Sequence, residues 1–556
     1  MTATTSRSRA EEHVPTPIDV YLRRQSQLTA VERFAGHTPG PREGPATERW
    51  WQDRLPATPP GPGQQYGFRV DLDACTGCKA CVSACHSLNG LSPDESWRSV
   101  GALRGGGASS TTLASVRTVT TACHHCVEPA CLQGCPANAY EKDPVTGIVR
   151  HLDDSCIGCS YCTLTCPYEV PQFHADLGIV RKCDMCADRL AAGEAPACVQ
   201  ACPTGAITID VVDVAALVTE TRTAGAVLVP GAPTSELTVP STRYVSASPL
   251  PADLVADDRS SVQPAHGHTP LAVMLVLTQV AVGAFTLDAV AVRDLSGPAR
   301  SAAALVALGT ALLALGASIL HLGRPRLAWR ALLGLSHSWL SREILAFSLF
   351  AGMATAWSTA LAFDQAQPLQ GALAAGAVGA GLAGVVCSVA IYAATGRWWW
   401  SWRLTALRFG ATTGAGGALL VAAAVAWAGT DDPAADVARR VVPLVTSATV
   451  LGLVGAVVPL VALLRPHGTD ADTVIRTRRL LGGALRPMVL GRLALAVLAI
   501  GGSWTAIANL GGSDLTPAGP GLVLTTATLL FVAGELFERR LFFLASVAPR
   551  MPGMAR

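Results

Sequence analysis

Four groups of cysteines carry most of the chemistry that this sequence offers. Sixteen of the 17 cysteines lie between Cys75 and Cys202. Two groups, CTGCKACVSAC and CIGCSYCTLTC, have the spacing C-x2-C-x2-C-x3-C, in which three thiolates bind one [4Fe–4S] cluster and the fourth reaches a neighbouring cluster. The other two, CHHCVEPACLQGC and CDMC followed by CVQAC, end in the same C-x3-C step. The expected iron ligands are Cys75, Cys78, Cys81, Cys85, Cys123, Cys126, Cys131, Cys135, Cys156, Cys159, Cys162, Cys166, Cys183, Cys186, Cys198 and Cys202.

Zinc sites and disulfides are the alternative uses of so many cysteines. Zinc takes four ligands in two pairs, whereas three cysteines and an outlier recur here four times. Disulfides are typical of exported domains, but the N-terminus MTATTSRSRA is polar, and the residues after Arg23 and Arg24 are too polar for a twin-arginine signal. We therefore expect four [4Fe–4S] clusters, which together form an electron-transfer chain that we call the wire.

The second half of the chain has the composition of a membrane domain. A bilayer core of about 30 Å needs about 20 mostly apolar residues per helix. Eight runs satisfy this requirement, at about 270–292, 302–321, 342–362, 370–394, 410–428, 441–464, 488–508 and 521–537. The expected fold class is an α+β ferredoxin-like four-cluster domain followed by an all-α transmembrane bundle of eight helices. We expect an irregular extension at 1–67, the cluster domain at 68–210, a linker at 211–268 and the anchor at 269–545.

Ionisable side chains inside the apolar runs or at their ends are candidates for function, because burying them in lipid is costly. A b-type haem needs two histidine ligands in the membrane, and only His321 falls at the end of an apolar run. We therefore expect no haem, so that a quinol would deliver electrons directly to a cluster. The ionisable candidates are Asp288, His321, Arg324, Glu343, Arg492 and Glu535, of which Asp288 and Glu535 equally suit contacts between helices.

Two further features of the membrane half are interpreted as structural rather than functional. Four tryptophans lie close together between two apolar runs, and such residues commonly mark the interface between lipid and water. We expect Trp398, Trp399, Trp400 and Trp402 to form such a belt. Cys387 lies within an apolar run and is expected to be an inert core residue.

The cysteine-rich segment resembles the four-cluster electron-transfer subunit of the dimethyl sulfoxide reductase family of molybdenum enzymes. In that family the first and fourth groups share one pair of clusters, and the second and third groups share the other. The resemblance implies four ligand sets, which we call the Cys75, Cys183, Cys123 and Cys156 sets. They are Cys75, Cys78, Cys81 and Cys202; Cys183, Cys186, Cys198 and Cys85; Cys123, Cys126, Cys131 and Cys166; and Cys156, Cys159, Cys162 and Cys135.

The membrane half is similar to the anchor subunit of the same family, an eight-helix, haem-free quinol oxidase module. The similarity lies in HLGRPRLAWRALLGLSHSWLSREI, from His321, and in GELFERRLFF, from Gly534. It implies a quinol site in which His321 hydrogen-bonds the quinol and Glu343 takes its proton. Arg324 and Glu535, from the same segments, complete the expected site. The implied donor is quinol or menaquinol from the membrane pool, and the implied partner is a molybdopterin-containing catalytic subunit.

Loop arginines predict the orientation in the membrane. With eight spans both termini lie on one side, and loops on that side carry twelve arginines against four in the opposite loops. Because cytoplasmic loops are enriched in basic residues, we expect the cluster domain and both termini on the cytoplasmic face of the cell membrane.

The sequence thus predicts a non-catalytic electron-transfer and anchor subunit of a quinol oxidoreductase. The same wiring run in reverse would reduce quinone. A redox-driven ion pump or transporter is the rival, and it requires a connected chain of ionisable residues across the bilayer. A zinc-stabilised membrane scaffold is a third possibility. Nucleic-acid binding is not expected, because the formal charge is only +2 and no basic patch with interleaved aromatic residues occurs.

Overall fold

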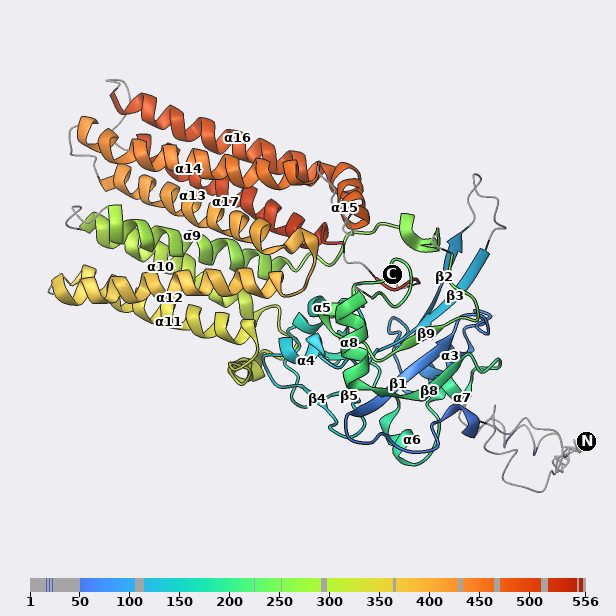
Figure 1. Ribbon diagram of the computed structural model, residues 1–556. Helices are drawn as coiled ribbons and strands as arrows, with labels where there is room; N and C mark the ends of the chain where they lie inside the picture. Colours follow the sequence, from blue (N-terminus) through green and yellow to red (C-terminus); the bar gives the residue numbers. More distant parts are fainter. Residues whose placement is uncertain are drawn as a thin grey trace, which may run out of the picture.

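A cysteine-rich domain and a long helical bundle lie side by side in the protein (Figure 1). The computed structural model describes residues 51–105, 115–224, 226–251, 253–291, 298–363, 367–428, 434–464, 471–511, 519–547 and 550–553, with positions 17, 20 and 23. Most of the expected extension at 1–67 lies outside the described residues. Its last part contains the short helical turn η1 (Gln52–Arg54) and the first residues of strand β1 (Gln64–Asp71).

Two three-stranded sheets form the frame of the cysteine-rich domain. In one, β1 pairs antiparallel with β8 (Ile207–Asp213) and parallel with β9 (Arg243–Val245). In the other, β2 (Ser99–Gly105) pairs antiparallel with both β3 (Ser115–Thr121) and β10 (Val255–Ala256). Phe68 and Val70 of β1 are buried in the domain core, as expected where alternate residues of a strand face one side.

The cysteine loops lie between two small hairpins and several short helices. The hairpins are β4 (Tyr140–Lys142) with β5 (Val149–His151), and β6 (Gln172–His174) with β7 (Ile179–Arg181). A short helix begins within or after each cysteine run, which turns the final cysteine of the run away from the first three. These helices are α3 (Ala80–Leu88), α4 (Ala130–Gly134), α5 (Tyr161–Thr165), α6 (Ala187–Ala191) and α7 (Ala197–Gln200).

The segment at 211–268, expected to be a linker, is instead a folded part of the cysteine-rich domain. It completes β8, forms helix α8 (Val214–Ala224), and supplies both β9 and β10 to the two sheets. It also contains the turns η2 (Ser235–Leu237) and η3 (Asp257–Ser260). The linker prediction was wrong because backbone pairing with distant strands, rather than local composition, fixes this segment.

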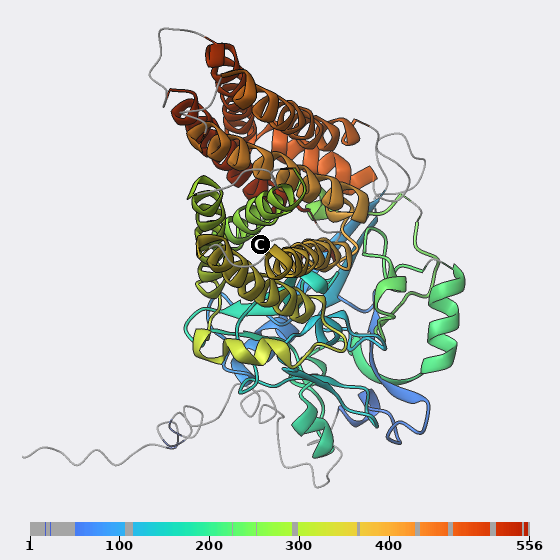
Figure 2. The same cartoon turned by 90° about the vertical axis from the view of Figure 1, so that its left-hand side faces the viewer.

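Eight helices in the second half are long and apolar enough to cross a membrane, as predicted. They run roughly parallel or antiparallel in one bundle, which Figure 2 shows from its far end. A short additional helix, α15 (Ala471–Gly482), lies at the end of the bundle nearest the cysteine-rich domain (Figure 1). The eight are α9 (Thr269–Ala291), α10 (Pro298–Ile319), α11 (Trp339–Ala362), α12 (Gln367–Ala393), α13 (Trp402–Ala428), α14 (Ala434–Ala462), α16 (Arg486–Ala508) and α17 (Gly519–Leu544).

Helix α13 is the most buried of the eight and packs against α9, α14 and α17. Small residues permit this packing: a Cβ atom on Gly283 of α9 would lie 1.8 Å from the carbonyl oxygen of Thr413. Close approach through small residues is the usual way in which membrane helices associate, since lipid provides little hydrophobic drive between them.

The tryptophans before α13 do not all lie at the lipid interface. Trp399 and Trp400 are buried, and the indole of Trp400 donates a hydrogen bond to the carbonyl oxygen of Phe542 at 2.8 Å. Trp402 is 52% exposed and remains compatible with an interfacial position. The prediction of a four-residue belt was therefore wrong for Trp399 and Trp400, which pack between α12, α13 and α17.

The C-terminal tail returns from the bundle to the cysteine-rich domain, where Figure 1 marks the end of the protein. Met551 is fully buried in the core of that domain, beside residues such as Leu103 and Val119. Arg550 pairs with Asp258 at 3.5 Å. The bundle is thus attached to the cysteine-rich domain both through the segment before α9 and through the tail after α17.

Candidate electron-transfer site

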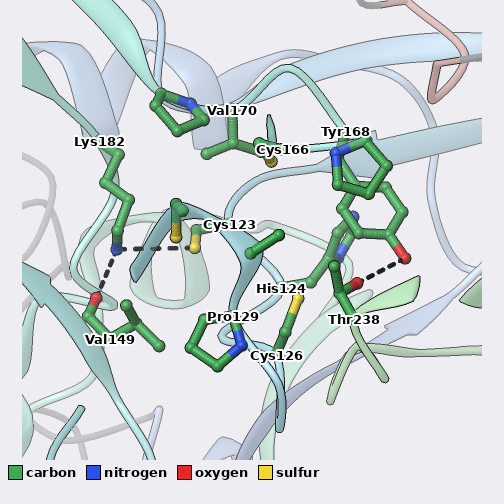
Figure 3. A pocket seen from close by; sticks show the side chains of 14 residues that line it. Cys123, His124, Cys126, Pro129, Val149, Cys166, Tyr168, Val170, Lys182 and Thr238 are labelled. Atoms are coloured by element: carbon green, nitrogen blue, oxygen red, sulfur yellow. Dashed lines mark hydrogen bonds between the residues drawn. The ribbon is translucent and has the colours of Figure 1, made fainter. Parts of the chain in front are cut away.

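The four thiols of the Cys123 set line one small cavity, although Cys166 is far from the other three in sequence (Figure 3). Cys123 and Cys126 come from the loop after β3, Cys131 lies in α4, and Cys166 follows α5. His124, Tyr168 and Lys182 share the wall of the cavity. The structure thus brings together the four cysteines that the resemblance assigned to one cluster.

The Cys156 set lines a second cavity of the same kind. Cys156, Cys159 and Cys162 lie in the loop before α5 and its first turn, and Cys135 joins them from the end of α4. Tyr140 and His151, on neighbouring strands, complete the wall. Helices α4 and α5 pack against each other, so each contributes the distant cysteine of the other's cavity.

The Cys75 and Cys183 sets lie around the contact between α3 and α7. Cys81 is within electrostatic range of Cys202, and Cys85 is within range of Cys198 and Cys186. This proximity follows the crossed pattern of the other two sets. Cys78 is exposed, so the Cys75 set lies nearest the surface of the domain.

Three features of these sites fit [4Fe–4S] clusters. Burial and the neighbouring thiols of Cys135 and Cys156 raise the pKa of the Cys159 thiol to about 12, so thiolates gather here only if metal brings positive charge. Among the described residues, no group of His, Cys, Asp and Glu is arranged to hold a single metal ion. A cubane with one iron at each of four corners instead needs four separated thiolates. Buried nitrogens of Arg98 and His124 lack a protein partner and can donate to cluster sulfides.

The sets follow one another from the outer surface to the anchor. Cys183 is within electrostatic range of both Cys85 and Cys123, which links the Cys183 set to the Cys123 set. Tyr140 lies within range of Cys131, Cys135 and Cys162, and therefore separates the Cys123 set from the Cys156 set. The order is the Cys75, Cys183, Cys123 and Cys156 sets.

The Cys156 set lies directly against the anchor. The loop between α10 and α11, which contains the 3-10 helix η4 (Pro325–Leu332), makes backbone hydrogen bonds to the cysteine loops. Gly323 donates to the carbonyl oxygen of Gly158 at 3.2 Å, and Gly334 donates to that of Pro136 at 2.8 Å. His337 donates from Nε2 to the carbonyl oxygen of Cys135 at 3.1 Å.

His321 and Glu343, the two residues expected to contact quinol, both lie near the Cys159–Tyr161 segment. His321 donates from Nδ1 to the carbonyl oxygen of Ser318 at 2.6 Å, and its ring also meets the backbone of Cys159. Burial lowers the pKa of His321, and the two backbone contacts partly oppose that shift. Glu343 is buried, accepts a hydrogen bond from Ser388, and lies within electrostatic range of Tyr161.

Arg324 and Glu535, also expected at the quinol site, are engaged elsewhere. Arg324 donates to the carbonyl oxygens of Asp153 and Leu177, at 2.8 and 3.3 Å, and so fastens the cysteine-rich domain to the anchor. Glu535 accepts a hydrogen bond from Thr412 at 2.5 Å and pairs with Arg492 at 3.8 Å, between α13, α16 and α17. The side chains of these two residues therefore bind partners other than His321 and Glu343.

Sequence reasoning missed Tyr161, which connects the cysteine-rich domain to the membrane core. It follows Ser160 within the third cysteine run, is buried, and donates its hydroxyl to the carbonyl oxygen of Ile391 in α12 at 2.8 Å. Its position between two cysteine ligands was the available signal. The partner, however, is 230 residues away in the sequence.

Comparisons with known proteins agree with this division of the polypeptide. A family model for the 4Fe-4S dicluster domain matches residues 114–212, and a model for the DMSO reductase anchor subunit (DmsC) matches residues 265–544. The sequence is 39% identical over 154 residues to the B subunit of the anaerobic dimethyl sulfoxide reductase of Escherichia coli strain K12, which covers 27% of this protein and 75% of that relative. The chain belongs to the dimethyl sulfoxide reductase family.

Two further relatives match the cysteine-rich part of this family member. The probable anaerobic dimethyl sulfoxide reductase subunit YnfG of Escherichia coli strain K12 is 40% identical over 148 residues, 26% of this protein and 72% of the relative. Thiosulfate reductase electron transfer subunit PhsB of Salmonella typhi is 40% identical over 144 residues, 26% of this protein and 74% of the relative. This family member therefore joins an iron–sulfur electron-transfer part and a multi-pass membrane anchor in one polypeptide.

Proposed function

We propose that this protein takes electrons from a membrane quinol beside His321 and Glu343 and passes them through four [4Fe–4S] clusters to a separate molybdopterin-containing catalytic subunit. One observation carries the proposal: the innermost cysteine set lies between the anchor and the other sets, with His321 in contact with Cys159 and Glu343 within electrostatic range of Tyr161. The family relatives named above include subunits of dimethyl sulfoxide and thiosulfate reductases, which supports a separate catalytic partner.

The roles of the two residues follow from their surroundings. Quinol becomes quinone by releasing two protons and two electrons. His321 donates from Nδ1 to the carbonyl oxygen of Ser318 and contacts the backbone of Cys159, so its imidazole ring is held beside the Cys156 set, where it can exchange a proton with a bound quinol. Glu343 provides a buried carboxylate for the second proton. When bound, the clusters supply one-electron transfer, so the two electrons leave one at a time.

The Cys75 set, which includes the exposed Cys78, is the proposed exit toward the catalytic subunit. Cys78 is exposed at the outer end of the wire, whereas the Cys156 set faces the anchor. An electron leaving the Cys75 set therefore has the shortest route to a partner docked on the outer surface of the domain. The same order of sites also permits flow from substrate to quinone.

A redox-driven ion pump receives less support from the ionisable residues of the bundle. Arg408, Arg492 and Arg539 lie within the ends of α13, α16 and α17 that face the cysteine-rich domain. The pair of Asp288 and Arg300, 3.1 Å apart, lies at the opposite ends of α9 and α10. These two groups sit at opposite ends of the bundle, whereas a pump needs a connected path between them.

The quinol assignment is tested with His321→Ala and Glu343→Gln in membranes that contain the whole complex. A menaquinol analogue should reduce the clusters roughly a hundredfold more slowly in each variant, because each loses a proton acceptor, while dithionite still reduces all clusters. Electron paramagnetic resonance follows both reactions. Unchanged quinol-driven reduction in both variants would remove these residues from the site.

The cytoplasmic orientation is a separate proposal, supported by the arginine bias of the loops. Val145 is 59% exposed on the cysteine-rich domain, so Val145→Cys provides an accessible thiol. A membrane-impermeant maleimide should label this variant in inverted vesicles and not in intact spheroplasts. Labelling in spheroplasts would place the domain outside.

A further inference from the structure

Lys182 places a buried positive charge between two of the cysteine sets. It follows β7 and is only 3% exposed. Its ammonium group donates to the carbonyl oxygen of Val149, donates to that of Cys183 at 2.9 Å, and lies 3.7 Å from Sγ of Cys123 (Figure 3). The three hydrogens of one ammonium group thus have three acceptors, two of which belong to cysteines of different sets.

The ammonium group of Lys182 is surrounded by cysteines and has no carboxylate partner among the described residues. It lies 3.7 Å from Sγ of Cys123, and the thiols of Cys131 and Cys183 also lie within electrostatic range. Within the described part of the protein, no carboxylate forms an ion pair with Lys182. A buried charge normally has a charged partner, because burial alone is costly. A negatively charged cluster on each side provides that partner here.

Arg98 occupies the equivalent position one step further out. It is 2% exposed, and the thiols within its electrostatic range are Cys81 of the Cys75 set and Cys85, Cys183 and Cys198 of the Cys183 set. Its Nη1 donates to Thr120 at 3.2 Å, and its Nη2 has no protein partner. The Cys183 set is therefore flanked by a cation on both sides.

The position between the Cys123 and Cys156 sets, nearest the anchor, differs from the two positions that hold Lys182 and Arg98. The described residues that line the cavity of the Cys156 set include no lysine or arginine, and Tyr140 and His151 occupy the corresponding wall. His151 pairs through Nδ1 with the carboxylate of Asp153 at 2.8 Å, so any positive charge on its ring is balanced there. A lysine or arginine thus lies between the Cys75 and Cys183 sets and between the Cys183 and Cys123 sets. In the described part of the chain, none lines the cavity of the Cys156 set, which is nearest the anchor.

We propose that Lys182 raises the reduction potentials of the clusters in the Cys123 and Cys183 sets, and that Arg98 does the same for the Cys183 and Cys75 sets. The inference rests on the proposed assembly of four clusters. Reduction adds a negative charge to a cluster, so a fixed positive charge beside the sulfurs stabilises the reduced state more than the oxidised one. Hydrogen bonds to cluster sulfurs act in the same direction.

The choice of lysine at this position supports a specific role. The sequence contains only three lysines among its 42 basic residues, and all three lie in the cysteine-rich domain. A tetrahedral ammonium group can reach two carbonyl oxygens and one sulfur at once, whereas a planar guanidinium cannot match that arrangement. Arginine at 182 would keep the charge and lose part of the contact with Cys123.

The experiment uses the full-length protein in its complex, in membranes titrated potentiometrically and followed by electron paramagnetic resonance. Lys182→Met and Lys182→Gln should lower the midpoint potentials of two clusters, those of the Cys123 and Cys183 sets, and leave the other two unchanged. Lys182→Arg should give a smaller shift. Arg98→Met is the matched comparison. It should lower the midpoint potentials of the clusters in the Cys183 and Cys75 sets and leave the midpoint potential of the Cys123 cluster unchanged.

Iron and acid-labile sulfide are measured first, so that the two proposals are judged separately. Wild-type protein without four clusters would contradict the proposed function, whatever the variants do. With four clusters present, unchanged potentials in Lys182→Met and Lys182→Gln, or equal shifts of all four clusters, would overturn the role of Lys182. If neither neutral variant assembles its clusters, Lys182→Arg decides: an unchanged potential of the Cys123 cluster would overturn the proposal.

Discussion

The amide of Gly323 donates a hydrogen bond to the carbonyl oxygen of Gly158 at 3.2 Å, and this contact joins the membrane anchor to the innermost cysteine loop. The two backbones approach closely because neither residue has a side chain. A Cβ atom on Gly323 would lie 2.2 Å from the carbonyl oxygen of Gly178, and one on Gly158 would lie 2.3 Å from the same oxygen. The spacing between His321, a residue of the proposed quinol site, and the Cys156 set therefore depends on three glycines.

Gly323→Val should separate the anchor from the cysteine-rich domain at this point. The added side chain cannot fit against the backbone of Gly178, so the loop before η4 must move. Quinol-driven reduction of the clusters should fall roughly tenfold or more, since displacements of about 1 Å are costly where reacting groups must be positioned. Stopped-flow absorbance measures the rate, and dithionite reduction should be unaffected. Gly316→Ala is the control, because a Cβ atom there meets nothing within 4 Å.

Tyr161→Phe should weaken the same interface by a single hydrogen bond. The hydroxyl of Tyr161 donates to the carbonyl oxygen of Ile391, and its loss should cost about 1 kcal/mol of stability. We expect a lower thermal midpoint in detergent, with unchanged iron content. Tyr66→Phe, on β1 and away from the anchor, serves as the control. Equal midpoints for wild type and Tyr161→Phe would show that this bond contributes nothing to docking.

Arg539→Met should destabilise the bundle strongly. Arg539 is fully buried in α17, where it pairs with Glu538 at 2.5 Å and donates to Gln279 and Thr412, both at 2.8 Å. Removing the cation leaves the buried carboxylate of Glu538 with less compensation, at a cost of about 3–5 kcal/mol.

The double variant Arg539→Met/Glu538→Gln tests this explanation. It should be less destabilised than the sum of the two single variants, because the unpaired carboxylate is gone. Arg439→Met is the control: Arg439 is 80% exposed and pairs with Asp436, so its loss should cost less than about 1 kcal/mol. Thermal unfolding in one detergent compares all four variants, and strict additivity would contradict the explanation.

Cys126→Ser should remove or alter one cluster of the wire. Cys126 lines the cavity of the Cys123 set, so the variant should lose up to about four iron atoms per molecule and the corresponding paramagnetic signal. Cys387→Ser is the matched control, since Cys387 lies in α12 and outside all four sets. It should keep the full iron content. Iron analysis with acid-labile sulfide measures both, and full iron in Cys126→Ser would remove Cys126 from the ligands.

The sequence alone predicted the features that depend on local spacing. The C-x2-C runs and their C-x3-C endings specify where thiolates can meet iron, because a cubane imposes its spacing on a short loop. The eight apolar runs specified eight helices, because lipid leaves the backbone no other hydrogen-bond partner. Both signals are local in the sequence, so no distant contact was needed to read them.

Tertiary structure decided everything that depends on pairs of distant residues. It placed strands of the segment at 211–268 in two sheets, buried Trp399 and Trp400, and gave the side chains of Arg324 and Glu535 partners other than His321 and Glu343. It also placed Lys182 against Cys123, 59 residues away. Long-range contacts of this kind leave no periodicity or spacing in the sequence, because they are fixed by the packing of whole elements rather than by sequence neighbours.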